Sequence, residues 1–296
     1  MNALLPRSTG QTFLSQLALD AGWSGPASPN VLLAAALLNA QPSGPDAYLR
    51  GLLRREAVDT SPQSDLRMVE AILWPIIQTW ANSYLLGVTP SGSFSKGTAN
   101  ASGTDIDLFI SISPNAVETL RQIYDTLERA LQAVGYATRR QNVSINITVG
   151  RYSVDLVPAK RQHLQSHDHS LYRRKVDSWT KTNVLLHAAH VGGSGRTEEI
   201  RILKLWRDQW GLDFPSFYLE LVVLRALGPL ASYGDVSANV WTVFQFLRDG
   251  FSGARIADPA NTNNIISDDL TAEDKRRISA AAHQALSCSN WSQIVV

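Results

Sequence analysis

The chain reads GSFSKGT from Gly92 to Thr98 and, after a few small residues, DIDLFI from Asp105 to Ile110. Side chains of a β-strand alternate between its two faces, so Asp105 and Asp107 point to one side while the apolar residues beside them enter the core. Two carboxylates on one face suit a hard cation such as Mg²⁺, which takes one or two carboxylates and completes its shell with substrate phosphates. Taken alone, the pair fits a calcium site or a surface pair equally well.

The residues ahead of the two aspartates are small. Around Gly92 and Ser93 the backbone N–H groups can approach a polyphosphate closely, and a helix that begins after this pair would add its positive end. The stretch is not a Walker A loop, because that motif places its second Gly directly before the Lys. The pattern therefore predicts metal-dependent chemistry on a nucleoside triphosphate.

A third aspartate belongs to a later apolar run. The segment 152–157 is expected to be a strand in which Asp155 faces opposite to Val154 and Leu156. A carboxylate buried on a sheet is costly unless it is paired or bound to a metal. We therefore expect Asp155 to join Asp105 and Asp107.

Hydrophobic periodicity and turn-forming residues predict the remaining helices and strands. Apolar residues at spacings of three and four predict helices over 12–20, 31–40, 62–82, 116–134, 200–210, from 215 onward and over 271–286. Short or alternating apolar runs predict strands over 85–88, 106–113 and 143–149. The helix over 62–82 is apolar all round, so burial along much of its length is expected. Residues from about 166 onward read as mostly helical.

Three of these features together, Gly92-Ser93, Lys96-Gly97-Thr98 and Asp105-x-Asp107, resemble the signature of the DNA polymerase β-like nucleotidyltransferases. Within that superfamily the chain is similar to the bacterial CD-NTases, relatives of cyclic GMP-AMP synthase and oligoadenylate synthetase that make cyclic oligonucleotide signals in antiphage defence.

The resemblance implies an α+β fold. A nucleotidyltransferase core, built from a small mixed sheet with flanking helices, would pack against a C-terminal helical domain, with the active site in the cleft between them. We accordingly expect an N-terminal helical segment over 1–60, the catalytic core with its long leading helix over 61–165 and the helical domain over 166–296.

The resemblance also implies roles for individual residues. Lys204 and Ser216 match positions that hold the triphosphate, together with Ser93 and its neighbouring backbone; Phe217 matches a position that is often aromatic and stacks on a base. For Lys204 the alternative is a solvated charge, and for Phe217 a place in the core. The run 258–264 is similar to an Asp-Pro loop of the same group.

For nucleotidyl transfer the resemblance implies two Mg²⁺ ions, with Mn²⁺ as a substitute. Asp105 and Asp107 are assigned to both ions, and Asp155 to the ion nearest the attacking hydroxyl, where it lowers that hydroxyl's pKa or accepts its proton.

The composition of the chain indicates its expected compartment and limits its expected partners. The chain has 296 residues, 44% of them hydrophobic, a net charge of +1 and a single cysteine. The near-neutral charge argues against an obligatory long nucleic acid, and the single cysteine and lack of a long apolar run predict a cytoplasmic protein off the membrane. His163, His167 and His169 suggest a metal cluster, but a polar loop without accompanying cysteines is the stronger interpretation.

The leading hypothesis is an enzyme that joins ribonucleoside triphosphates into a cyclic di- or trinucleotide second messenger. A downstream effector that senses the product is implied by the family, and a regulatory partner protein is another expectation. The alternatives are a linear or tRNA-tailing nucleotidyltransferase and a catalytically silent nucleotide-binding regulator.

Overall fold

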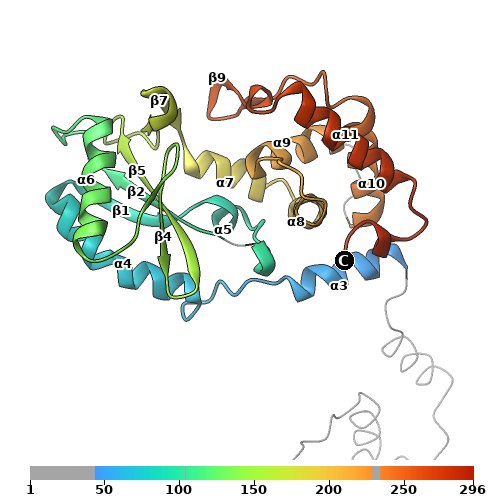
Figure 1. Cartoon of the computed structure of the whole chain (residues 1–296), viewed down its shortest axis with the longest axis horizontal. Coiled ribbons are helices and arrows are strands. Elements are labelled where there is room, and N and C mark those ends of the chain that lie inside the picture. Colours follow the sequence, from blue (N-terminus) through green and yellow to red (C-terminus); the bar gives the residue numbers. More distant parts are fainter. Residues whose placement is uncertain (1–43, 104, 229–233) are drawn as a thin grey trace, which may run out of the picture. The chain divides into compact units, whose positions relative to one another are not determined.

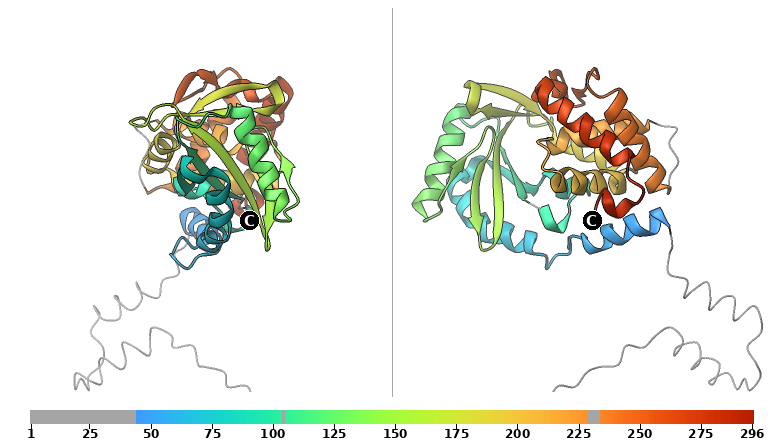
Figure 2. Two further views of the ribbon diagram at one scale, coloured as in Figure 1. Left: turned by 90° about the vertical axis from the view of Figure 1, so that its left-hand side faces the viewer. Right: turned by 45° about the vertical axis from the view of Figure 1, so that its right-hand side comes forward.

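A computed structural model describes residues 44–103, 105–228 and 234–296 of the chain (Figures 1 and 2). The helices expected over 12–20 and 31–40 lie outside these residues. Residues 49–296 form one compact unit, which holds all the contacts described below.

In the described part of the chain seven strands form one mixed sheet, in the order β1-β2-β5-β4-β3, and β6 and β7 extend it beside β5. The strands are β1 (Leu85–Pro90), β2 (Ile106–Ile112), β3 (Arg139–Arg140), β4 (Ile145–Val149), β5 (Tyr152–Arg161), β6 (His169–Arg173) and β7 (Ser178–Thr182). β2 and β5 run parallel, whereas the other neighbours are antiparallel. A separate pair, β8 (Ala257–Asp258) and β9 (Asn261–Ile265), lies in the C-terminal region. With the helices below, this is the expected α+β fold.

One face of the sheet carries the main core. Leu73 and Ile77 of α4 (Asp65–Ala81) and Leu127 of α6 (Leu120–Ala133) belong to the same buried cluster as Leu108 of β2 and Leu156 of β5. Figure 1 shows α4 and α6 beside the sheet. Since side chains alternate along a strand, the aspartates of β2 and β5 project from the opposite face.

The long helix α4 is buried on one side only. Met68, Ile72 and Trp74 remain 53%, 52% and 39% exposed. Its buried residues run from Leu66 to Ala81, so the expected burial along much of its length is confirmed, but for one stripe only, because α4 covers the sheet with that stripe and no described element packs over the other.

The helix expected over 116–134 begins later, and its start has a clear cause. The Thr119 hydroxyl accepts from the backbone N–H of Gln122 (3.2 Å), and the Gln122 side chain accepts from the Thr119 N–H (2.8 Å). This capping box fixes the first turn at Leu120. Gly135, at φ +94°, ends the helix as expected.

The region after residue 166 differs from expectation at its start. Residues 169–182 form β6 and β7, so the helical interpretation of this stretch is wrong; the β6–β7 hairpin is instead held by pairing with β5. The boundary drawn at 165/166, like the rest of the three-part division, stays a prediction.

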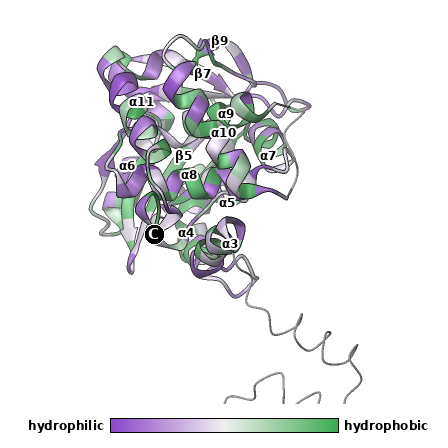
Figure 3. Ribbon diagram, turned by 90° about the vertical axis from the view of Figure 1, so that its right-hand side faces the viewer, coloured by the Kyte–Doolittle hydropathy of each residue, from purple (hydrophilic) through white to green (hydrophobic). Residues whose placement is uncertain are grey.

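From Val184 onward the chain is mostly helical, as expected. The helices are α7 (Val184–Gly192), α8 (Thr197–Gln209), α9 (Ser216–Leu227), α10 (Val236–Asp249) and α11 (Ala272–Leu286), in addition to α3 (Pro45–Arg55) and the short α5 (Gly92–Lys96). Figure 3 shows the hydrophobic colour along α9, seven of whose residues are buried. In the described ranges no helix combines the length and apolarity needed to cross a membrane.

Candidate active site

The parallel pairing of β2 and β5 brings two of the three aspartates together. Asp107 and Asp155 are direct partners in the register, and both are half-buried. The neighbours of Asp155, Val154 and Leu156, are fully buried on the other face, as predicted. Asp105 stands just ahead of β2 and is exposed. The structure thus gathers these aspartates at one end of the paired strands.

Gly92 lies against Asp107 at a distance that excludes any side chain. A Cβ at this glycine would come within 1.7 Å of the Asp107 carboxylate Oδ2, and its φ of +56° lies in the left-handed region. The backbone N–H of Ser91 donates to the Asp107 carbonyl (2.8 Å). The Gly-Ser turn is therefore fixed directly on β2. Its helix α5 has five residues and begins at Gly92 itself, whereas the sequence placed the start after Gly92-Ser93.

The electrostatics of the site disfavour two neighbouring negative charges. Burial, followed by the nearby Asp155 carboxylate, raises the pKa of Asp107 to about 7. Burial also raises the pKa of Asp155, although Asn146 Nδ2 and Gln141 Nε2 donate to its Oδ1 (2.8 and 2.9 Å) and favour the ionised form. The two amides leave Oδ2 of Asp155 without a hydrogen bond within the described residues.

This carboxylate set fits a divalent cation. The donors are all carboxylate oxygens, the type that Mg²⁺ prefers. Burial and, after it, the neighbouring Asp155 carboxylate raise the pKa of Asp107, and a bound cation would counter both effects. Across the residues described, no three His, Cys, Asp or Glu side chains already stand in metal-ligating positions. The exposed Asp105 side chain has the freedom to turn toward an ion, whereas Asp107 and Asp155 are held by their strands.

Lys204 is not a solvated charge; it lies in a buried polar cluster. Its Nζ donates to Glu220 Oε1 (2.6 Å) and to Thr98 Oγ1 (2.9 Å). Glu220 Oε2 accepts from Lys96 Nζ (2.8 Å), and Thr98 Oγ1 donates to Glu220 Oε1 (2.9 Å). We call these four residues the Glu220 cluster. Burial lowers the pKa of Lys204, while the Glu220 carboxylate acts in the opposite direction.

The Glu220 cluster adjoins a small cavity that collects the other residues assigned to the triphosphate. A space of about 40 Å³ is lined by Ser93, Lys204, Arg207 and Ser216, among others. The exposed Ser216 hydroxyl accepts from Arg207 Nη1 (2.7 Å). Ser93 from the Gly-Ser turn and Lys204 and Ser216 from the helical region thus line one space, and their role in holding the triphosphate stays a prediction.

Phe217 lines a second pocket, of about 230 Å³, which also includes Gly92, Lys96, Asp107 and His187. Its ring is half-buried, and the His187 ring lies at 4.5 Å, tilted by 46°. The ammonium of Lys96 lies 4.5 Å from the Phe217 ring centroid. We call this space the His187 pocket. Phe217 is therefore at a cavity wall next to Asp107 and not inside the core.

A larger hollow opens at Asp105. It measures about 680 Å³, and its lining includes Phe94, Ser102, Arg151 and Tyr152. Two separate cavities therefore meet the aspartates, one at Asp105 and one at Asp107.

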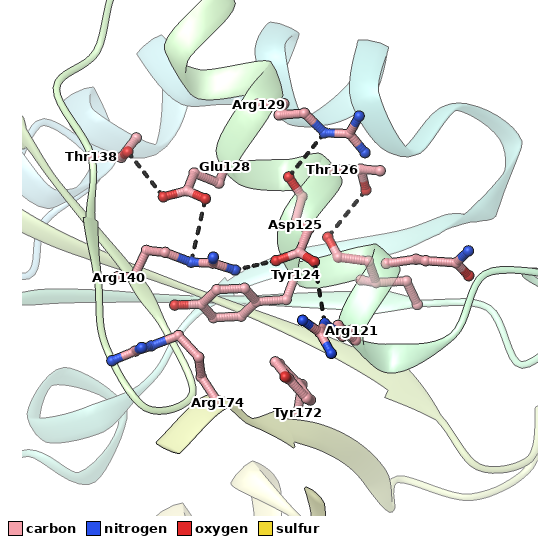
Figure 4. Close-up of polar contacts among 12 residues, drawn as sticks. Arg121, Tyr124, Asp125, Thr126, Glu128, Arg129, Thr138, Arg140, Tyr172 and Arg174 are labelled. Carbon is pink, nitrogen blue, oxygen red and sulfur yellow. Dashed lines mark hydrogen bonds and ion pairs between the residues drawn. The ribbon is translucent and has the colours of Figure 1, made fainter. Parts of the chain in front are cut away.

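The loop that carries Gln141 is held from behind by α6. Tyr124 is fully buried, and its single hydroxyl proton is shared between the carbonyl oxygens of Gln141 (3.0 Å) and Ser144 (2.8 Å). Figure 4 shows its ring between Arg140 and Arg174, and Arg174 Nε donates to the same Gln141 carbonyl (3.1 Å). These contacts position the Gln141 amide that binds Asp155.

The three histidines do not form a metal site. His169 is buried, with Nε2 at 2.8 Å from Ser111 Oγ and Nδ1 at 2.8 Å from the His167 carbonyl. Burial lowers the pKa of His169. His169 stands at the start of β6 and His163 in the preceding segment, so the expected loop covers only part of the stretch.

Sequence reasoning missed three polar residues of the site, Asn146, Gln141 and Glu220, and assigned no role to Lys96 and Thr98 although both belong to the motif. Asn146 could have been found, because the alternation of β4 places it on the face of Asp155, its register partner. Glu220 lies more than 120 residues from Lys96 and Thr98, so no spacing signal links it to them. Gln141 precedes its strand.

Comparison with solved structures shows that the chain has the fold of the CD-NTases and other polymerase β-like nucleotidyltransferases. One neighbour is CdnC of E. coli MS115-1 in its complex with HORMA-deltaN, with a TM-score of 0.65 and 20% identity over 81% of this chain and 88% of that one. Another is the Cid1 poly(U) polymerase bound to Mg 3′-dATP, with a TM-score of 0.61 and 13% identity over 83% and 95% of the two chains.

Among curated proteins the chain is 24% identical over 177 residues to cyclic AMP-AMP-AMP synthase of Escherichia coli (strain MS 115-1). The match takes in 53% of this chain and 55% of the synthase, so it spans about half the length of each. No protein-family model matches. Because a poly(U) polymerase and CdnC share the fold, the fold does not decide the product.

Proposed function

We propose that this protein is a Mg²⁺-dependent nucleotidyltransferase that joins ribonucleoside triphosphates into a cyclic di- or trinucleotide and releases pyrophosphate. The observation that carries the proposal is the register of β2 and β5, which sets Asp107 beside Asp155 with the Gly92 turn against Asp107. The likeness to cyclic AMP-AMP-AMP synthase supports a cyclic product.

Asp105, Asp107 and Asp155 are the residues that would hold two Mg²⁺ ions, or Mn²⁺ in their place. When bound, such ions stabilise negative charge on the attacking and leaving oxygens of a phosphoryl transfer. The carboxylates suit this role because Asp155 lies close enough to Asp107 to disfavour its ionisation, and a bound cation would remove that penalty.

In the transfer step a ribose hydroxyl oxygen forms a bond to the α-phosphorus of a triphosphate. The bond from that phosphorus to the α–β bridging oxygen breaks, and pyrophosphate leaves with the electron pair. The hydroxyl proton passes to Asp155, whose Oδ1 is fixed by Asn146 and Gln141. General-base help of this kind contributes about 10²- to 10⁴-fold in rate.

The cavities supply places for two nucleotides. The space lined by Ser93, Lys204 and Ser216 is too small to enclose two phosphates, so these side chains would contact phosphate oxygens at its mouth, and Phe217 offers a ring face to the base of the same nucleotide in the His187 pocket. The larger hollow at Asp105 suits the second nucleotide, whose hydroxyl attacks. An enzyme that joins nucleotides needs both places.

A linear oligonucleotide or tRNA-tailing activity is the second candidate, and the fold shared with the Cid1 poly(U) polymerase favours it. The net charge of +1 speaks against a long RNA as obligatory substrate. A catalytically silent regulator is the third, and the preserved set of three aspartates speaks against it.

We place the activity in cytoplasmic antiphage signalling of the CBASS type, with a downstream effector that senses the product. A regulatory partner protein is part of the proposal, since the neighbour CdnC was solved in complex with HORMA-deltaN.

The decisive experiment incubates the purified protein with all four labelled ribonucleoside triphosphates and Mg²⁺ or Mn²⁺, followed by phosphatase treatment and mass spectrometry. A phosphatase-resistant product without terminal phosphates is expected, and its mass gives the bases and ring size. A ladder of linear products would move the assignment to the second candidate. The double variant Asp105→Ala with Asp107→Ala should fold and form no product; turnover by that variant would remove the assignment.

A further inference from the structure

The His187 pocket has a polar wall that the transfer chemistry does not use. His187 lies on α7, next to Phe217 of α9, and both rings border the space that begins at Asp107. At about 230 Å³ the pocket is smaller than the ~300–1,000 Å³ typical of sites for whole drug-sized ligands. It therefore suits one base of a nucleotide whose phosphates lie elsewhere.

One nitrogen of His187 is committed to a buried carboxylate. Nε2 lies 2.7 Å from Oδ1 of Asp258, a residue that is only 4% exposed. The Asp258 carboxylate also accepts from the Ala260 N–H (2.8 Å) and from Asn264 Nδ2 (3.4 Å). Burial acts to raise the pKa of Asp258, but the hydrogen bond from His187 and these further donors bring it below its ordinary value.

An ionised carboxylate accepts hydrogen bonds and donates none, so Nε2 of His187 carries the proton in this pair. In the neutral imidazole the other nitrogen, Nδ1, is then an acceptor. Nδ1 has no hydrogen-bond partner within the ranges that the structure describes. It is the polar atom of His187 that remains for a ligand.

We infer that neutral His187, held in one tautomer by Asp258, selects the base of the nucleotide in this pocket by accepting a hydrogen bond at Nδ1 from an exocyclic amino group. The inference rests on the proposed function and specifies its substrate: triphosphates with a 6-aminopurine or 4-aminopyrimidine base are favoured over analogues that lack the amino group. Asp258 is a positioning residue, because it acts through His187.

The test measures equilibrium binding of ATP and of purine-riboside triphosphate, which differs from ATP only in lacking the amino group, to the full-length protein with Mg²⁺. The wild type should bind ATP about 10- to 100-fold more tightly, because a buried acceptor left unpaired is costly. His187→Phe keeps a ring beside Phe217 but removes both nitrogens. It should bind the two triphosphates equally, with the affinity for purine-riboside triphosphate preserved.

Two further variants sharpen the result. His190→Phe, at an exposed position on the same helix, is the matched control and should keep the wild-type preference. Asp258→Ala removes the acceptor that holds the proton on Nε2, so Nδ1 can carry the proton and donate; this variant should gain affinity for inosine triphosphate, with its 6-oxo group, relative to ATP.

The outcomes separate the two proposals. If the wild type binds neither triphosphate, the proposed function fails and the inference with it. If both bind but His187→Phe keeps the preference for ATP, or if the wild type prefers inosine triphosphate, base selection by a His187 acceptor is overturned while the proposed function stands.

Discussion

Gly92 and Asp107 are in direct contact, and this contact sets the position of a carboxylate through a residue without a side chain. A Cβ at Gly92 would clash with the carboxylate itself. Any larger residue would displace Asp107 from its partner Asp155. The role of this glycine is thus both conformational and steric.

We expect Gly92→Ala to lower activity by at least about 10²-fold, because a displacement of a reacting group by about 1 Å has an effect of that size. The matched control is Gly97→Ala. Gly97 also has a positive φ (+69°), but the nearest atom to its added Cβ is 3.8 Å away. Both variants should lose a similar amount of stability from backbone strain, about 1 kcal/mol, in thermal unfolding. Equal activity in the two would show that contact with Asp107 is irrelevant.

Asp107 also makes the stability of the metal-free protein depend on pH. Its pKa is about 7 in the folded chain and near the ordinary 3.8 in the unfolded chain. Between pH 3.8 and pH 7, Asp107 is largely ionised in the unfolded chain but still protonated in the folded chain. The free energy of unfolding therefore falls as the pH rises and levels off above pH 7. In a chelator, the melting temperature of the wild type should fall more from pH 5 to pH 8 than that of Asp107→Asn. Parallel curves for the two would contradict the raised pKa.

At the scale of elements, the Glu220 cluster ties the Gly-Ser helix α5 to α8 and α9. Glu220 is fully buried between Lys96 of α5 and Lys204 of α8, and Thr98 closes the network. Burial acts to raise the pKa of Glu220, but the two ammonium groups bring it below its ordinary value. The cluster therefore holds Lys204 at the edge of the small cavity, paired with the Glu220 carboxylate.

Glu220→Gln should destabilise the protein by about 3 kcal/mol, since it leaves two buried ammonium groups without a carboxylate. Glu220 stabilises the folded chain fully above about pH 4.5, and this stabilisation is lost as the pH falls further. The difference in the free energy of unfolding between wild type and variant should therefore shrink in acid. Denaturant unfolding at pH 7 and pH 4 measures both effects. Glu198→Gln, which breaks an exposed ion pair with Arg50, is the control and should change stability by less than about 1 kcal/mol.

At the scale of the whole molecule, the site is complete only when distant parts of the chain meet. The Gly-Ser turn, the two strands with their aspartates and the helices with Lys204 and Phe217 belong to the same unit, 49–296. A nucleoside triphosphate that contacts all of them should stabilise this unit as a whole.

ATP with Mg²⁺ should therefore raise the melting temperature, and ATP with excess chelator should do so much less. A ligand at 100 times its Kd adds about 2.7 kcal/mol to the free energy of unfolding. Differential scanning fluorimetry on the wild type and on Asp105→Ala with Asp107→Ala gives the comparison. An equal shift by ATP in chelator would mean that the carboxylates hold no cation for the nucleotide.

The sequence by itself determined the elements whose signals are local. Alternation placed the aspartates of β2 and β5 on one face, because the period of a strand is fixed by backbone geometry. Gly135 marked the end of α6 through its positive φ. The similarity of the Gly-Ser and aspartate motifs was enough to name the fold that the solved neighbours share.

Tertiary structure decided the rest, because it depends on contacts between residues remote in the chain. The strands over 169–182 carry no strong alternation and form by pairing with β5. Whether Lys204 is solvated or buried was settled by Glu220, 16 residues away, and by Thr98, 106 residues away. The pairing of His187 with Asp258 spans 71 residues, and only the folded chain brings that carboxylate to the imidazole.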